Sequence, residues 1–458
     1  MKERFEIVEK TIVTMLEGKK YTTLRDVLVT MNPADIAAVF SGIEEEQIPL
    51  LFRLLPKETA ADTFAEMEPE EQEVLVRGFS DNELRQILDE LYVDDAADLV
   101  EEMPANVVKR ILRQATPEMR NTINQLLRYP ENSAGSMMTT EFVTLREDMT
   151  VGDSILRIRR QGVDKETIYT CYVTRDKKLI GIVTVKDLLL AQTDDVLISD
   201  IMETNLISVT TVTDREEVAR MFSRYNFLAL PVVDMENRLV GIVTFDDAMD
   251  VLEEETTEDM EIMGGMLPSE KTYLKSSAWE LFKNRIPWLM LLMVSATFTG
   301  MIITAFEGAL AAQVALTAFI PMLMGTGGNS GSQSSVTVIR ALSLGELRFS
   351  DLPRVIWKEI RTAVLCGVIL AAVCFLKIWY VDRLLLGNTD ITLMIDGVVC
   401  LALLVTVLLA KLVGAVLPMA AKALKLDPAV MASPFITSIV DAVSLLVYFL
   451  FAKLLLGV

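Results

Sequence analysis

The apolar positions of this chain are concentrated toward its C-terminus. Residues 286–458 are apolar with short polar interruptions, whereas residues 1–285 are rich in Glu and Asp. A helix needs about 20 apolar residues to cross a bilayer. The longest apolar stretches predict five membrane-spanning helices, at about 286–305, 310–336, 355–380, 391–420 and 431–456. We therefore expect a soluble part followed by an all-α membrane domain over 281–458.

Residues 1–130 predict a helical regulatory domain. Apolar residues recur at helical spacing, as in Ile36, Val39, Phe40 and Ile43. Proline or a small polar residue precedes many of the amphipathic runs, which is a common way for a helix to begin. Similar short units follow one another, such as PADIAAVF, KETAADTF and DDAADLV. This degenerate repetition predicts a solenoid-like stack of short helices.

Residues 131–253 change to a repeated α/β pattern. The segment GIVTVKD at 181–187 returns as GIVTFDD at 241–247, and a Met-containing lead begins each copy, with Met138 in one and Met202 in the other. The segment resembles a tandem pair of cystathionine-β-synthase-type (CBS) domains. That resemblance implies a regulatory module that often binds adenosyl ligands, with ATP as the candidate here. The candidate nucleotide-binding residues are Thr184, Asp187 and Phe227.

An acidic helix is predicted directly after the CBS pair. The chain contains no Lys or Arg from residue 246 to 261, and Asp247, Asp250, Glu254 and Glu258 recur on one helical face. Like charges at this spacing repel one another by roughly 0.2–0.5 kcal/mol per pair. One interpretation is that an external cation completes the set, and the other is an acidic linker helix. We assign residues 254–280 to this connecting helix.

A carboxylate, Asp441, lies in the middle of the last apolar segment. A charge at the bilayer centre costs at least about 2.5–3.5 kcal/mol, and such residues usually face a protein interior or a wet pathway. Ser433 and Thr437 precede Asp441 at intervals of four residues, which places all three on one helical stripe. The alternative is a carboxylate paired with a basic residue for helix packing.

The second apolar segment contains a polar, glycine-rich sequence, PMLMGTGGNSGSQSS, at 321–335. We interpret it as a loop at membrane depth that is covered by protein or faces a cavity, with Asn329 and Gln333 as candidate pore-lining residues. The alternative is a close-packed interface of small residues, which explains the glycines but not Asn329 and Gln333. A loop of this kind opposite the Asp441 stripe would make an oxygen-lined path. Oxygen ligands select a hard cation such as Mg²⁺ or Ca²⁺.

Charge and composition narrow the class of function. The net charge of −21 argues against nucleic acid as a partner, because phosphate binding needs a basic face, and it suits a cationic partner. Histidine, the commonest transition-metal ligand and near-neutral general base, is absent. The sequence contains no recognisable nucleophile–base arrangement or phosphate-binding loop. We therefore do not expect an enzyme.

Basic residues and cysteines indicate the orientation and the compartment. Lys and Arg cluster before the first predicted span, between the second and third, and between the fourth and fifth. The positive-inside rule then predicts N-terminal domains in the cytoplasm and a C-terminus outside the cell membrane. The first residues do not read as a signal peptide. The cysteines, which form no CxxC pair and indicate a reducing compartment for the soluble part, are Cys171, Cys366, Cys374 and Cys400.

The whole chain resembles the MgtE-type magnesium transporter family. The resemblance rests on GTGGNSGSQSS in the second span, DPAVMASPFITSIVDAVSLLVYF in the fifth, the CBS pair and the acidic helix. It implies a homodimeric, Mg²⁺-selective, channel-like transporter with its pore at the dimer axis, in which Asp441 would be the pore carboxylate. The acids that it implies for regulatory Mg²⁺ are Asp94, Asp98, Glu216, Asp247, Asp250, Glu255, Glu258, Asp259 and Asp427. The departures from the family pattern are Asn226, Ser332 and Ser433.

These features lead to one gating hypothesis and its rivals. When Mg²⁺ is scarce, the acidic surfaces repel and the pore opens; bound Mg²⁺ bridges them and draws the connecting helix against the pore. One rival is a CBS-regulated transporter of another divalent cation, such as Co²⁺ or Mn²⁺. Another carries an organic or anionic solute, for which Lys411 is the only basic candidate, although snorkelling or packing also explains it. The last is a membrane-anchored adenine-nucleotide sensor.

Overall fold

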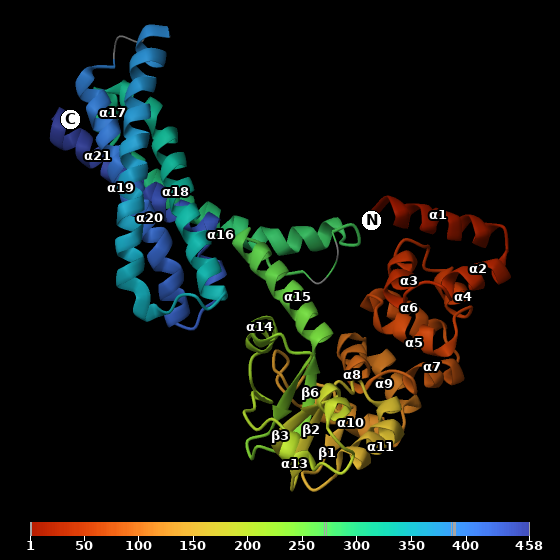
Figure 1. Cartoon of the computed structure of the whole chain (residues 1–458). Helices are drawn as coiled ribbons and strands as arrows, with labels where there is room; N and C mark the ends of the chain where they lie inside the picture. Colours follow the sequence, from red (N-terminus) through yellow and green to blue (C-terminus); the bar gives the residue numbers. More distant parts are fainter. Residues whose placement is uncertain (1, 270, 272, 386, 388–390, 458) are drawn as a thin grey trace. The chain divides into compact units, whose positions relative to one another are not determined.

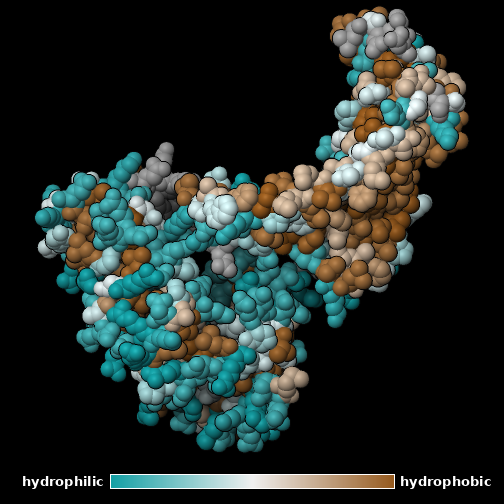
Figure 2. All heavy atoms as spheres, turned by 180° about the vertical axis from the view of Figure 1, so that it is seen from behind, coloured by the Kyte–Doolittle hydropathy of each residue, from teal (hydrophilic) through white to brown (hydrophobic). Residues whose placement is uncertain are grey.

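The computed structural model describes residues 2–269, 271, 273–385, 387 and 391–457, except for the side chains of residues 2–6, 164 and 433. The chain divides into two compact units, Met1–Leu252 and Glu253–Val458 (Figure 1). In the view of Figure 2, hydrophilic side chains cover most of the first unit, and apolar side chains cover most of the second. This contrast follows the division that the hydrophobic pattern predicts.

The N-terminal part of the first unit is a stack of short helices. Most of them pack on the helix two places further along the chain, as α3 does on α5 and α5 on α7. This arrangement confirms the solenoid-like prediction, since each unit buries its apolar face only between neighbours. The helices are α1 (Lys2–Glu17), α2 (Tyr21–Leu28), α3 (Pro33–Phe40), α4 (Ile48–Phe52), α5 (Lys57–Ala65), α6 (Pro69–Gly78), α7 (Asp81–Leu88), α8 (Val93–Glu102), α9 (Ala105–Gln114) and α10 (Pro117–Leu126).

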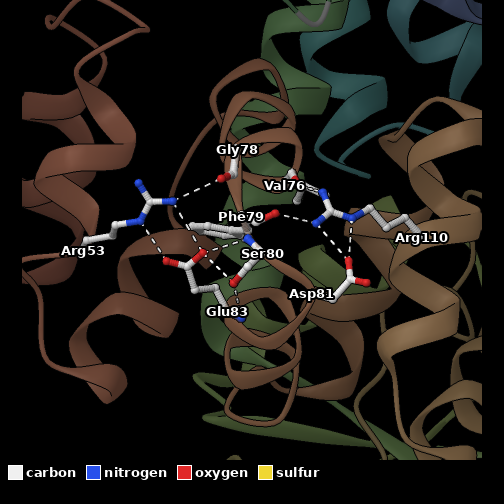
Figure 3. Close-up of polar contacts among 8 residues, drawn as sticks. All are labelled: Arg53, Val76, Gly78, Phe79, Ser80, Asp81, Glu83 and Arg110. Atoms are coloured by element: carbon white, nitrogen blue, oxygen red, sulfur yellow. Dashed lines mark hydrogen bonds and ion pairs between the residues drawn. The ribbon is translucent and has the colours of Figure 1, made fainter.

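Two arginines join helices of this stack that are not consecutive in the chain (Figure 3). The Arg53 guanidinium, just after α4, donates to Glu83 Oε1 at 2.8 Å and to the Gly78 carbonyl at 3.1 Å. The Arg110 guanidinium on α9 donates to the Val76 and Phe79 carbonyls at the end of α6. Each arginine therefore satisfies carbonyls that the end of a helix leaves without an internal partner.

The CBS pair forms two small sheets with the same topology. In each sheet the first strand is parallel to the second, and the second is antiparallel to the third. The first repeat contains β1 (Thr144–Leu145), α11 (Val151–Gln161), a 3-10 turn (Gly162–Asp164), β2 (Thr170–Arg175), β3 (Lys178–Thr184) and α12 (Val185–Leu190), and the short helix α13 (Ile198–Ile201) follows it. The second contains β4 (Val209–Thr210), α14 (Arg215–Tyr225), β5 (Ala229–Val233) and β6 (Leu239–Thr244).

The methionine leads and the glycines of the two repeats pack against each other across the pair. A Cβ built on Gly181 would lie 2.6 Å from Met202 Sδ, and one built on Gly241 would lie 2.5 Å from Met138 Sδ. Each lead also pairs with the third strand of the other repeat, through bridges between Thr139 and Ile242 and between Ile182 and Glu203. The glycine of each GIVT motif therefore leaves room for the methionine of the opposite lead.

The acidic segment after the CBS pair is helical, as predicted. Helix α15 covers Phe245–Met263, so it begins directly at the end of β6 and crosses the boundary between the two units. The connecting helix was expected over 254–280, but the described residues from 264 to 277 are not helical. Gly265, at φ +72°, ends the helix region with a conformation that favours glycine.

The second unit is a bundle of long helices that run side by side (Figure 1). Helix α18 packs against both α20 and α21, and α19 packs against α20. The helices and turns of this unit are α16 (Ala278–Ala305), α17 (Glu307–Ala312), η2 (Val314–Phe319), α18 (Ile320–Ser343), η3 (Phe349–Asp351), α19 (Leu352–Lys377), η4 (Ile378–Leu385), α20 (Leu393–Ala423), η5 (Pro428–Met431) and α21 (Ser433–Leu456).

Among the described residues, the helical segments that are long and apolar enough to cross a membrane are Ala278–Ala305, Phe349–Leu385, Leu393–Ala423 and Pro428–Leu456. The bounds of the second predicted span, 310–336, are wrong. The first part of that range belongs to α17 and η2, and a separate helix, α18, begins at Ile320. Helix α18 has 24 residues but is not among the four segments. Neighbouring helices cover much of α18, so it need not be apolar all round.

The loop predicted for 321–335 is also wrong, because these residues lie within the continuous helix α18. Its glycines are packing positions: a Cβ on Gly328 would lie 2.9 Å from Thr437 Cγ2, and one on Gly331 would lie 2.8 Å from Ile436 Cγ2. A Cβ on Gly414 of α20 would lie 2.2 Å from the Gly331 carbonyl oxygen. The close-packed interface of small residues therefore accounts for the glycines.

Candidate metal sites

Several carboxylates gather where the helical stack meets the second CBS repeat. Asp94 and Asp95 lie in the first turn of α8, and Asp98 follows one turn later. Asp246 and Asp247 lie in the first turn of α15. Each group stands near the N-terminus of its helix, where the partial positive charge of the backbone favours carboxylates. We call these five residues the acidic cluster.

Burial and the neighbouring charges raise the pKa of four of these carboxylates, Asp94, Asp95, Asp98 and Asp247. Burial, followed by the charge of Asp247, raises the pKa of Asp95 to about 7 and that of Asp98 to about 8. Burial, followed by a neighbouring aspartate, also raises the pKa of Asp94 and of Asp247 well above the usual range. Asp94 is 7% exposed, whereas Asp98 is exposed and partly screened by solvent. A cation at the acidic cluster would relieve this repulsion.

Two acidic residues of the first CBS repeat extend the cluster. Burial, followed by the charges of Asp94 and Asp95, raises the pKa of Glu166 to about 9. Its Oε2 atom is buried and has no hydrogen-bond partner among the described residues. Glu141 contributes repulsion to Asp94 and Asp95 as well. Sequence analysis missed Asp95, Glu141 and Glu166, because no periodicity connects residues that come from separate elements.

The structure brings together only part of the predicted regulatory set. Asp94, Asp98 and Asp247 belong to the acidic cluster, while Glu216 instead forms an ion pair with Arg220 at 2.6 Å within α14. Asn226 ends that helix in the left-handed conformation, at φ 55°, which asparagine tolerates well.

The remaining predicted acids lie on α15 or next to the membrane helices. Asp250 is exposed, and Glu255 and Glu258 are half-buried. Ser343 Oγ at the end of α18 donates to Asp259 Oδ2 at 3.3 Å, so α15 contacts a membrane helix. The Asp427 carboxylate caps η5 by accepting from the Ala429 amide at 2.8 Å. Among the described residues, no three Asp, Glu, Cys or His side chains are arranged to hold one metal ion.

Asp441 lies on α21 without a basic partner among the described residues. Its Oδ1 atom is buried and has no hydrogen-bond partner there, and the side chain as a whole is half-buried. This geometry does not match the alternative of a carboxylate paired for packing. Thr437, one turn earlier, packs its methyl group against Gly328. Ser433 begins α21, but its side chain lies outside the described residues.

The polar residues of α18 divide between two faces. Gly327, Gly328 and Gly331 are buried, whereas Asn329 and Gln333 are exposed and Ser332 is half-buried. The spacing of four residues between Asn329 and Gln333 places them on one stripe. Small residues therefore bring α18 close to α20 and α21, and the amides point to the other side.

Lys411 on α20 is buried among the membrane helices. It is 5% exposed, and its Nζ donates to Ser334 Oγ at 3.4 Å. The Ser334 hydroxyl in turn donates to Glu359 Oε2 at 2.7 Å. This short network joins α18, α19 and α20, so it agrees with the packing interpretation of Lys411 and not with snorkelling.

The candidate nucleotide residues have structural roles of their own. Asp187 accepts hydrogen bonds from the Thr184 amide at 3.0 Å and from its hydroxyl, which forms a capping box at the start of α12. Thr244 and Asp247 repeat this arrangement at the start of α15. The Phe227 ring stacks on Tyr225 with centroids 5.4 Å apart. The T-x-x-D spacing is a helix-start signal that sequence analysis did not use.

Comparison with known proteins identifies the family. The MgtE model, described as a divalent cation transporter, matches residues 320–451, and the MgtE intracellular N domain matches 31–132. The CBS domain matches 134–194 and 198–254. The chain is 38% identical over 456 residues to the magnesium transporter MgtE of Thermus thermophilus, covering 98% of this chain and 99% of the relative. The chain belongs to the MgtE family.

Other MgtE proteins support the same assignment. The chain is 33% identical over 445 residues to the magnesium transporter MgtE of Bacillus subtilis, covering 97% of this chain and 96% of the relative. The solved cytosolic domain of the Mg²⁺ channel MgtE in complex with ATP is 38% identical, with a TM-score of 0.51, and covers 53% of this chain and 99% of its own. A second solved structure, the soluble part of a magnesium transporter, is 30% identical, with a TM-score of 0.51. The match covers 55% of this chain and 99% of that structure's chain.

Membership of the MgtE family confirms several predictions. The chain is a membrane transport protein with a CBS pair, and it is not an enzyme. The fold class, a helical N-terminal domain followed by a CBS pair and apolar helices, is confirmed as well. The individual site residues, the dimer and the position of the C-terminus stay predictions.

Proposed function

We propose that this chain carries Mg²⁺ across the cell membrane, with Asp441 as the carboxylate of the path. The observation that supports this most directly is the buried Oδ1 atom of Asp441 in an apolar helix, which has no hydrogen-bond partner among the residues that the structure describes. A charge that the protein does not neutralise at this depth is costly, and a passing dication would offset the cost. The full-length similarity to proteins named magnesium transporters supports the same cargo.

Mg²⁺ fits this site because it dehydrates reluctantly. It usually keeps several waters and contacts one or two carboxylates, so one Asp441 from each of two chains would be enough. Asn329 and Gln333 are exposed on a single chain, which suits polar residues that meet a second copy across a wet path. We propose a homodimer for this reason. We also propose that the N-terminal domains are cytoplasmic and the C-terminus is outside.

Flux measurements in liposomes test the transport proposal. Purified protein is reconstituted, and Mg²⁺ entry is measured with and without competing Co²⁺, Mn²⁺ or Ca²⁺. Asp441→Asn should reduce the flux at least tenfold. The matched control is Asp396→Asn, since Asp396 is also an intramembrane carboxylate but accepts a hydrogen bond from Cys400 at 3.5 Å. Wild-type flux in Asp441→Asn would remove Asp441 from the path, and preferred transport of another ion would replace Mg²⁺ as the cargo.

We further propose that cytosolic Mg²⁺ closes the path through the acidic cluster. The mutual repulsion of Asp94, Asp95 and Asp247 supports this, because Mg²⁺ binding would favour the compact arrangement of α8 against α15. The contact between Asp259 and Ser343 gives α15 a place to act on α18. Closure at high internal Mg²⁺ would provide negative feedback on uptake.

Protease protection of α15 tests the gate. Mg²⁺ should protect the segment from Asp247 to Asp259 in the wild-type protein, and Asp247→Asn should need several times more Mg²⁺ for the same protection. Asp187→Asn is the matched control, because Asp187 caps α12 as Asp247 caps α15 but lies outside the acidic cluster. Equal cleavage with and without Mg²⁺ would exclude the gating proposal.

ATP is proposed as a ligand of the CBS pair. The support is a relative of 38% identity whose cytosolic domain was solved in complex with ATP. The candidate residues are Thr184, Asp187 and Phe227. Calorimetric titration with ATP, repeated for Phe227→Ala, tests the site: binding that Phe227→Ala leaves unchanged would move it elsewhere.

A further inference from the structure

Basic and aromatic side chains form one exposed stripe at the start of α19. Arg354, Trp357, Lys358 and Arg361 follow one another at intervals that place them on one side of the helix. All four side chains are exposed, and Trp357 is 60% exposed. We call these four residues the α19 stripe.

The other side of α19 holds the helix in the bundle. Its buried residues are Val355, Ala363, Gly367 and Cys374. A Cβ built on Gly367 would lie 3.4 Å from Leu404 Cγ of α20, so the two helices are in close contact there. Glu359, which also points away from the stripe, accepts from Ser334 Oγ of α18 at 2.7 Å. The α19 stripe therefore lies on the outer surface of the described chain.

Two tryptophans indicate the depth of the stripe in a membrane. The Arg361 guanidinium lies 5.8 Å from the centre of the Trp357 ring, and that of Arg383 lies 5.2 Å from the centre of the Trp379 ring. Along the helix, the two tryptophans are roughly 33 Å apart at a rise of 1.5 Å per residue, close to the thickness of about 30 Å of a hydrocarbon core. Tryptophan is enriched at both membrane–water interfaces. The spacing therefore places the α19 stripe at the level of the lipid headgroups.

The stripe carries positive charge on a chain whose net charge is −21. Arg354 forms an ion pair with Asp351 at 3.0 Å. In the described part of the chain, no ion pair is recorded for the Lys358 ammonium or the Arg361 guanidinium. A guanidinium stacked on an aromatic ring can still donate from its edge to an oxyanion. The positive-inside rule accounts for basic residues in this connection, but not for their place beside a tryptophan on one exposed side.

An apolar surface continues the stripe along α19. Leu365 and Ile369 follow Arg361 at intervals of four residues, and they are 68% and 63% exposed. The outer side of the helix thus changes from basic and aromatic to purely apolar as it enters the bilayer. A molecule with an anionic head and an apolar tail matches this order.

We propose that the α19 stripe binds an anionic phospholipid, with the phosphate at Lys358 and Arg361 and an acyl chain along Leu365 and Ile369. Lys and Arg donate charge-assisted hydrogen bonds to phosphate oxygens, and clusters of them beside a membrane-crossing helix recognise anionic lipids. A zwitterionic lipid fits less well, because the two cations repel its own ammonium group. The proposal does not depend on which ion the protein carries.

Lipid binding to the full-length protein, purified in a non-ionic detergent, tests the proposal. Native mass spectrometry measures the fraction of protein that carries lipid during titration with phosphatidylglycerol, or with phosphatidylcholine of the same acyl chains. The wild type should bind phosphatidylglycerol roughly five- to twentyfold more tightly, since each of the two cations contributes a factor of up to about five. The double variant Lys358→Gln/Arg361→Gln should bind the two lipids equally. Equal binding by the wild type, or an unchanged preference in the double variant, would overturn the proposal.

The matched control removes the same charge from outside the stripe. Arg340 and Arg348 are exposed residues of the same connection, but they do not lie on α19. Arg340→Gln/Arg348→Gln should keep the preference for phosphatidylglycerol. An equal loss of preference in both double variants would indicate a general effect of charge and would overturn the assignment to the stripe.

A photoreactive lipid locates the bound molecule on the wild-type protein. Phosphatidylglycerol with a diazirine in one acyl chain should label α19 near Leu365 and Ile369 on illumination. Excess glycerophosphoglycerol, the soluble headgroup, should not prevent this labelling. Competition by the headgroup would indicate a site for soluble anions, and absence of label from α19 would indicate that another protein surface covers the stripe; either result would overturn the proposal.

Discussion

Replacing Asp95 tests whether the negative charges of the acidic cluster destabilise the folded first unit. Burial and the charge of Asp247 raise the pKa of Asp95 from 3.8 to about 7. The folded protein therefore keeps this proton up to about pH 7, whereas the unfolded chain releases it near pH 4. Between these values unfolding releases a proton, so a rise in pH favours the unfolded chain. The stability of the first unit should fall from about pH 4 to pH 7 for this reason.

The expected size of the effect follows from the same shift. A shift of about 3 pKa units corresponds to at most about 4 kcal/mol, at about 1.36 kcal/mol per unit. Solvent screening of a half-buried side chain reduces this figure to about 2 kcal/mol. Asparagine also loses about 0.5 kcal/mol of favourable interaction with the N-terminus of α8. Asp95→Asn should thus stabilise the unit by about 1–2 kcal/mol at pH 8, or about 2–8 °C in melting temperature.

The assay is thermal unfolding of a fragment of residues 1–263, followed by circular dichroism at several pH values. Without Mg²⁺, the increase in melting temperature caused by Asp95→Asn should be near zero at pH 4, grow up to pH 7 and stay constant above it. Millimolar Mg²⁺ should stabilise the wild type more than the variant at pH 8. Asp89→Asn, the same change on an exposed residue outside the acidic cluster, is the control. A destabilised Asp95→Asn at pH 8, or an advantage that does not depend on pH, would refute the reasoning.

Three further changes test the packing and the charges elsewhere. Gly414→Ala should lower the melting temperature of the full chain by several degrees, because its Cβ would meet the Gly331 carbonyl at 2.2 Å; Gly397→Ala on the same helix, with nothing described within 4 Å, should not. Arg53 holds the pKa of Glu83 down to about 2, so Glu83→Gln should lower the free energy of unfolding by about 1 kcal/mol at pH 7. This loss should fade as the pH falls from 4.5 to 2, and unfolding measured at each pH checks it. Lys411→Met should keep cation flux in liposomes within about twofold, since buried ion networks often tolerate apolar replacement; a lost flux would give Lys411 a transport role.

Much of the architecture could be predicted from local patterns. Amphipathic runs that begin with proline predicted the short helices, and the repeated GIVT motif predicted the duplicated sheets. Both patterns depend only on residues that are close together in the chain. The glycine-rich sequence of α18 was misread because glycine favours a loop in isolation. In the fold, contacts such as those of Gly328 with Thr437 and of Gly331 with Ile436 stabilise a helix there, and no pattern within residues 321–335 contains that information.

The amino-acid sequence by itself determined the division into a soluble and a membrane part, the CBS repeat, the family resemblance and the presence of a charge, Asp441, in an apolar helix. These properties depend on composition and on spacing along one chain. Only the tertiary structure decided which carboxylates meet, since Asp95 on α8, Glu166 in the first repeat and Asp247 on α15 come from separate elements. It also decided that the Asp441 Oδ1 atom has no hydrogen-bond partner in the described part of the chain and that Lys411 has one. Burial and mutual repulsion act between residues that are close in space, and distance along the chain does not reveal them.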